Sequence, residues 1–99
     1  MFLDRFRLDG RVAIVTGAGQ GIGAGIATAF ADAGADVVCA ARTQAKIDAV
    51  AAGVRERGRR GLAVACDVMK REDLENLVRR TLDELGRIDV LVNNAGGSA

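Results

Sequence analysis

The sequence predicts an α/β protein in which a parallel sheet carries helices on both faces. Four short apolar runs alternate with three amphipathic segments along the 99 residues. The runs show little polar alternation, as expected of parallel strands that are buried on both faces. Glycines follow each amphipathic segment, at Gly34, Gly58 and Gly86, and allow the chain to turn there. Right-handed crossovers through the helices would then make the strands parallel.

The first strand is expected at about residues 11–15, after the turn signal Asp9-Gly10. Four apolar residues before it are expected to pack a lead-in segment against the sheet: Phe2, Leu3, Phe6 and Leu8. The first helix follows Gly21, and Gly34 is its expected stop. Its apolar face, which we expect to be core, consists of Ile22, Ile26, Ala29, Phe30 and Ala33.

The second strand is expected at residues 37–40, and Thr43 is a suitable N-cap for the helix after it. That helix places Ile47, Val50 and Val54 on one face. The third strand is expected at residues 62–66, where it leads into Asp67-Val68.

The third helix is expected at residues 70–85, with Glu72 and Asp73 in its first turn, where acidic side chains are favourable. Its apolar stripe consists of Leu74, Leu77, Val78, Leu82 and Leu85. Gly86 ends this helix, and residues 88–92 form the fourth strand.

Composition narrows the classes of partner. A net charge of +1 creates no field that would recruit nucleic acid, and we expect the basic stretch at residues 55–60 to be a solvated helix end. No apolar run approaches the ~20 residues that a membrane-spanning helix needs. Charges within residues 1–5 argue against a signal peptide, so a cytoplasmic protein without a membrane partner is expected.

The two cysteines lie in apolar runs. Cys39 and Cys66 each fall within a predicted strand, and the chain contains no histidine. Two thiols without a nearby imidazole do not make a zinc site. We therefore expect buried, reduced thiols and predict no metal site.

A glycine-rich stretch, residues 16–23, joins the first strand to the first helix. It has the spacing T-G-x-x-x-G-x-G in full, whereas G-x-G-x-x-G/A is met only through Gly19, Gly21 and Ala24. Gly17 would take the sharp turn, Gly21 would let a pyrophosphate approach the backbone, and Gly23 would let the helix pack on the strand. The helix N-terminus beyond it favours a phosphate.

Two further motifs follow in order, Asp67-Val68 and Asn93-Asn94-Ala95-Gly96. Together with the glycine stretch they resemble the short-chain dehydrogenase/reductase family over nearly the whole chain. The resemblance implies a Rossmann-type doubly wound sheet with strand order 3-2-1-4, and it makes residues 1–99 a truncated NAD(P)-binding domain. It also implies a cofactor site formed by Gly17, Gly19, Gln20, Gly21, Ile22, Arg42, Thr43, Asp67, Val68, Asn93, Ala95 and Gly96.

Asp67 and Asn93 each have a structural alternative. In the family the residue matching Asp67 receives the adenine amino group, and an ionised Asp, which only accepts hydrogen bonds, suits that role. Asp67 can equally bond nearby backbone as a turn residue. The turn that contains Asn93 would line the cofactor and tie neighbouring strands together, so its Asn side chains are as much scaffold as ligand.

The nucleotide preference depends on the end of the second strand. An acidic residue about ~20 residues after the glycine turn selects NAD through the adenosine ribose, but Ala41 stands there and Arg42 follows. A guanidinium can pair with a 2′-phosphate, which favours NADP over NAD. Alternatively, Arg42 is only solvated: Gln20 stands where NADP-preferring members often carry a second basic residue.

Catalytic residues are not assigned. The family uses Ser, Tyr and Lys, with a Tyr-x-x-x-Lys motif beyond Asn-Asn-Ala-Gly, whereas this chain has no tyrosine. We therefore expect the N-terminal portion of an NADP-dependent oxidoreductase, similar to ketone or 3-oxoacyl reductases, without carbonyl reduction by the chain alone. A non-catalytic nucleotide-binding module and an inactive truncated product are the alternatives. An unprotected fourth strand predicts self-association or pairing with a missing C-terminal half.

Overall fold

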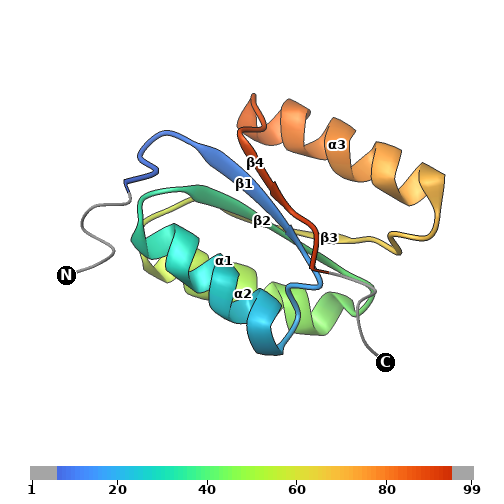
Figure 1. Cartoon of the computed structure of the whole chain (residues 1–99), viewed down its shortest axis with the longest axis horizontal. Helices are drawn as coiled ribbons and strands as arrows, with labels where there is room; N and C mark the ends of the chain where they lie inside the picture. Colours follow the sequence, from blue (N-terminus) through green and yellow to red (C-terminus); the bar gives the residue numbers. More distant parts are fainter. Residues whose placement is uncertain (1–6, 95–99) are drawn as a thin grey trace.

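The computed structural model describes residues 7–94 and contains four strands and three helices within them. The predicted lead-in residues Phe2, Leu3 and Phe6 and the predicted site residues Ala95 and Gly96 lie outside this range. The elements are β1 Val12–Thr16, α1 Gly21–Asp32, β2 Asp36–Ala41, α2 Gln44–Glu56, β3 Gly61–Ala65, α3 Arg71–Leu85 and β4 Val90–Val92 (Figure 1).

The strands form one parallel sheet in the order β3-β2-β1-β4. Helices α1 and α2 lie together on one face and α3 lies on the other (Figure 1). This arrangement confirms the predicted fold class and strand order. Because all four strands run the same way, their carboxyl ends meet at one edge of the sheet, where ligands of open α/β sheets bind.

Most element boundaries agree with the predictions to within a residue or two. The central strand β1 is buried along its whole length, as the lack of polar alternation indicated. Gly86 takes a positive φ of 84° and caps the C-terminus of α3. Thr43 occupies the N-cap position of α2, but its hydroxyl makes no capping hydrogen bond, so the predicted side-chain cap does not form.

The predicted core face of α1 is only partly correct: Ala33, at the C-cap of the helix, is buried as predicted. Ile22 is 76% exposed, and the buried positions of the helix are Gly23, Ala27 and Ala31. Ile26 and Phe30 are only partly buried beside them. The small residues recur every four positions, so they line one side of the helix and let its backbone approach the sheet closely. Close approach, and not side-chain size, decides which face is core.

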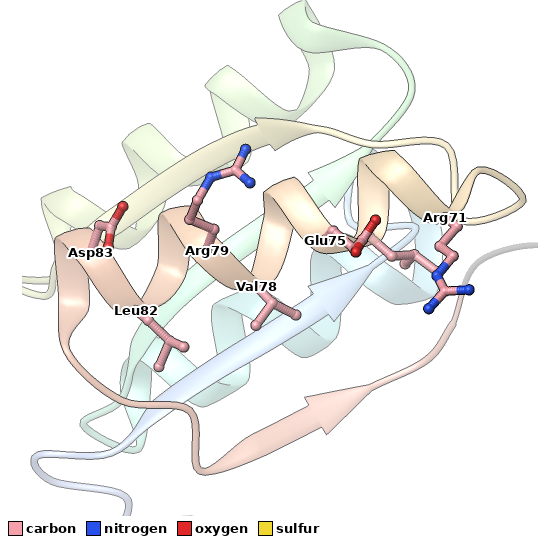
Figure 2. Close-up of a pocket in the computed structure, with 7 residues that line it drawn as sticks. Arg71, Glu75, Val78, Arg79, Leu82 and Asp83 are labelled. Atoms are coloured by element: carbon pink, nitrogen blue, oxygen red, sulfur yellow. The ribbon is translucent and has the colours of Figure 1, made fainter.

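The predicted apolar stripe of α3 is only half buried. Leu77 and Leu85 pack into the core with Thr81 between them, whereas Leu74, Val78 and Leu82 are 38%, 44% and 46% exposed. These three line a shallow groove whose rims are charged, formed by Arg71, Glu75, Arg79 and Asp83 (Figure 2). The apolar side chains of α3 therefore extend beyond the part of the helix surface that packs against the sheet.

Both cysteines are free and buried, as predicted. Burial raises the pKa of the Cys39 thiol to about 11. Among residues 7–94 no three His, Cys, Asp or Glu side chains gather closely enough to hold a metal ion. No helix in this range is long and apolar enough to cross a bilayer.

The basic stretch at the C-terminal end of α2, residues 55–60, makes specific contacts. Arg57 pairs with Asp32 at 2.8 Å, Arg60 pairs with Asp36 at 2.9 Å, and Arg55 donates to the carbonyl of Gly61. These guanidiniums are exposed at the helix end, as predicted, but they also tie it to neighbouring elements.

Candidate functional site

The turn between β1 and α1 needs glycine at two positions. Gly17 and Gly21 have φ values of 65° and 59°, a region that side chains with a Cβ seldom occupy. A Cβ at Gly21 would meet no atom within 4 Å, so the backbone there faces open space. The sharp turn predicted for Gly17 is therefore present, and the backbone at Gly21 is accessible to a ligand.

Gly23 has the packing role that its spacing predicted. A Cβ there would collide with the Gly17 carbonyl oxygen and would lie 2.8 Å from Nδ2 of Asn94. Any larger residue would push α1 away from the turn. Because Gly23 has no side chain, the N-terminus of α1 can lie directly against the end of β1.

The N-terminus of α1 is open to an anion. Gln20 is the N-cap residue, its side chain makes no capping bond, and the first turn contains no acidic residue. The first N–H groups of a helix have no acceptor within the helix. Ile22 lies exposed in this turn, where a site residue and not a core residue is expected.

Thr16 joins the glycine turn to the end of β4. Its Oγ1 accepts the N–H of Asn94 at 2.9 Å and lies 3.2 Å from Oδ1 of Asn93. Nδ2 of Asn94 donates to the Gly17 carbonyl at 3.4 Å. Asn94, which belongs to the predicted turn motif but not to the predicted cofactor residues, therefore links β4 to β1, and the scaffold role of the Asn pair is observed directly.

Asp67 follows β3 and adopts the turn that was its structural alternative. Its Oδ1 accepts the Met69 N–H at 3.0 Å, and its own N–H donates to Oδ2 of Asp73 at 2.9 Å. No hydrogen bond to its Oδ2 forms within residues 7–94, so one carboxylate oxygen is available to a ligand. Val68 packs its side chain against the cluster under α3.

Arg42 and Thr43 lie exposed where β2 ends and α2 begins. Within the described part of the chain, neither the Arg42 guanidinium nor the Thr43 hydroxyl has a hydrogen-bond or ion-pair partner. Lys46, three residues beyond Thr43, donates from Nζ to Oε1 of Gln20 at 2.9 Å. This contact brings an ammonium to the glycine turn, although Lys46 was not among the predicted site residues.

The predicted residues between 17 and 93 thus gather at one edge of the sheet. The register aligns Thr16 with Ala40, Ala41 with Ala65, and Val15 with Val92, so all four strand ends reach this edge. An open helix N-terminus, two cations and a carboxylate occur along it. This set suits a ligand that carries phosphates and has a donor group at its other end.

Comparisons with known proteins agree with this geometry. The sequence profile of the family described as short chain dehydrogenase matches residues 11–99. An uncharacterized oxidoreductase of Mycobacterium tuberculosis is 49% identical over 98 residues, which are 99% of this chain and 37% of that protein. The chain therefore spans little more than a third of the length of such relatives.

Two solved structures have the same fold. A hydroxysteroid dehydrogenase from Escherichia coli superposes with a TM-score of 0.90 at 42% identity. The match covers 95% of this chain and 40% of the dehydrogenase chain. L-Sorbose reductase from Gluconobacter frateurii, in complex with NADPH and L-sorbose, superposes with a TM-score of 0.89 at 38% identity. This match covers 95% of this chain and 36% of the reductase chain. By its motifs, its fold and these matches, the chain belongs to the short-chain dehydrogenase family and corresponds to the N-terminal portion of its members.

Proposed function

We propose that this chain is the NADP-binding portion of an oxidoreductase that transfers hydride between a nicotinamide and a carbonyl or alcohol substrate. The observation that carries the proposal is that an open α1 N-terminus and an Arg42 guanidinium without a partner among residues 7–94 lie at the same edge of the sheet. The first suits a pyrophosphate and the second suits a 2′-phosphate. A related reductase structure contains NADPH.

Different residues of the site would bind different parts of the nucleotide. Gly17, Gly19 and Gly21 form the turn whose backbone would receive the pyrophosphate, with Gln20 and Ile22 beside it. The free Oδ2 of Asp67 would accept the adenine amino group, and the backbone of Val68 would border the ring. Asn93 would line the side nearer the nicotinamide, while the predicted contributions of Ala95 and Gly96 lie outside the described range.

The preference for NADP rests on charge at the end of β2. A carboxylate at Ala41 would accept hydrogen bonds from a free ribose and repel a 2′-phosphate. Ala41 contributes no charge, while the adjacent Arg42 offers a planar set of donors that matches phosphate geometry. Thr43, with no bonding partner for its hydroxyl in the described part of the chain, can contribute a further donor.

The nicotinamide supplies the hydride, and general acid help to the substrate oxygen is typically worth about 10²–10⁴-fold. The chain has neither tyrosine nor histidine to give that help. We infer that it binds the cofactor in the cytoplasm without turnover on its own, and that it self-associates or pairs with a C-terminal half. NADPH oxidation with a ketone or 3-oxoacyl substrate, by protein free of host reductases, would contradict the absence of turnover.

The cofactor assignment is tested by titrating NADP⁺ and NAD⁺ into the parent chain and into Arg42→Ala. Loss of a charge-assisted contact should lower the affinity for NADP⁺ on the order of ten- to hundredfold and leave that for NAD⁺ nearly unchanged. Arg79→Ala, an exposed arginine on α3, is the matched control and should change neither affinity. An unaltered ratio in Arg42→Ala would refute the proposed preference.

A further inference from the structure

We propose that Lys46 is a second determinant of the preference for a 2′-phosphate, held at the glycine turn by Gln20. The inference deepens the proposed NADP-binding function and rests on it. Gln20 is neutral, so a second positive charge beside the turn cannot come from the turn itself. In the folded chain it comes from α2, 26 residues further along the sequence.

Two contacts place Lys46 beside the glycine turn. Its Nζ donates to Oε1 of Gln20 at 2.9 Å. A Cβ added to Gly19 would lie 3.1 Å from Cβ of Lys46 and 3.8 Å from Cβ of Ala41. The aliphatic part of the Lys46 side chain therefore lies against Gly19, which leaves room for Lys46 because it has no side chain. The turn, the end of β2 and the start of α2 meet here.

The charge on Lys46 has no counter-charge nearby. No carboxylate forms an ion pair with it in the range 7–94, and its recorded partner is the uncharged amide oxygen of Gln20. An ammonium carries three donors, so two remain after this bond. Arg42, four residues before it, is unpaired in the same range. Arg42, just before α2, and Lys46, in its first turn, thus lie near a helix N-terminus that itself carries a partial positive charge, and together they would attract a dianionic phosphate.

A purely structural role for the contact would be weak. A hydrogen bond between two exposed side chains contributes little to stability, because water competes for both groups. If Lys46 only held the turn in place, its loss would weaken every nucleotide alike. If it acts on the 2′-phosphate, its loss would weaken only nucleotides that carry one.

The experiment compares 2′,5′-ADP with 5′-AMP, two probes that differ at the 2′-phosphate, by calorimetric titration at low salt. The variants are Lys46→Met, which keeps the apolar stem, Lys46→Gln, which keeps a donor, and Lys46→Arg, which keeps the charge. Lys70→Met removes the only other lysine as a matched control. Circular dichroism verifies that each variant is folded.

For Lys46→Met and Lys46→Gln we expect the affinity for 2′,5′-ADP to fall about three- to tenfold and that for 5′-AMP to change less than about twofold. Lys46→Arg should retain the preference, Lys70→Met should match the parent, and added salt should reduce the difference. Equal losses for both probes, or no loss, would overturn the role of Lys46. If the Lys46 variants gave such a result while Arg42→Ala lost the preference for NADP⁺, the proposed function would stand and only the role of Lys46 would be refuted. A parent chain that binds neither probe would refute both.

Discussion

The two faces of the sheet differ in how completely they are covered. Under α1 and α2 the core side chains are almost wholly buried, including Val15, Val37, Ile47 and Val54. Under α3 a second cluster is buried, but Leu74, Val78 and Leu82 remain exposed on the helix. In Figure 2 the side chains of Val78 and Leu82 point from α3 toward the side on which β4 runs. One face is closed and the other is open.

The strand at the edge shares this asymmetry. Leu91 of β4 is 63% exposed and lies opposite Ile14, a member of the cluster under α3. Val92, the next residue, points to the other face and packs against the closed cluster. The open region therefore includes both the outer side of α3 and the adjoining side of β4. The side of the sheet under α1 and α2 is therefore fully covered, whereas the side under α3 retains an exposed apolar surface that further polypeptide could cover.

The largest expected effect is on the free energy of unfolding. It is tested by replacing leucine with alanine at a buried and at a half-exposed position of α3. Leu77→Ala should lower the free energy of unfolding by about 2–5 kcal/mol, because it opens a cavity in the cluster under α3. Leu82→Ala removes the same atoms from a half-exposed position and should cost less than about 1 kcal/mol. Urea denaturation measures both. Similar losses would mean that the exposed part of α3 is already covered in solution.

A smaller effect is expected on self-association. The open region should make the chain associate as its concentration rises, and Val78→Lys combined with Leu82→Lys should weaken association on the order of tenfold or more by placing charge on the apolar surface. Sedimentation velocity over a range of concentrations measures this. Lysine at two exposed positions of α2, Ala45→Lys with Ala49→Lys, is the control on the closed side. A parent chain that stays monomeric throughout would contradict the prediction.

The smallest effect concerns the amino end of the sheet, where Asp89 ties β4 to β1. Its carboxylate accepts the Val12 N–H at 2.8 Å and pairs with Arg87 at 2.7 Å. The Arg87 hydrogen bond, followed by that of Val12, lowers the pKa of Asp89 below its ordinary value. The resulting stability is present above the unfolded-state pKa of about 3.9 and is lost as the pH falls through the lower folded-state pKa.

Asp89→Asn should therefore be less stable than the parent at pH 7, and its stability should depend less on pH between about pH 4 and pH 2. Thermal unfolding across that range measures the difference. Asp83→Asn, which removes an exposed carboxylate without an ion pair in the described residues, is the control. A parent and an Asp89→Asn variant with parallel pH profiles would show that Asp89 does not tie the strands in this way.

Sequence reasoning was most successful where a local conformation requires a particular residue. The turn at Gly17 and the helix stop at Gly86 follow from positive φ values that favour glycine. It was only partly right about the buried face of α1, because it followed the spacing of apolar residues, whereas close packing against the sheet also selected Gly23 and Ala27. It also did not show that Thr43 would leave its hydroxyl unbonded at the start of α2.

By itself, the sequence determined the alternation of strands and helices, the glycine turn and the family, because periodicity and motifs are patterns within short segments, and the family follows from three such motifs in order. Only the tertiary structure decided which contacts join distant segments. Lys46 reaches Gln20, and Asn94 reaches Thr16 and Gly17, across separations of 26, 78 and 77 residues. Such contacts depend on strand register and helix placement, which are properties of the packed sheet and are not encoded in any single segment.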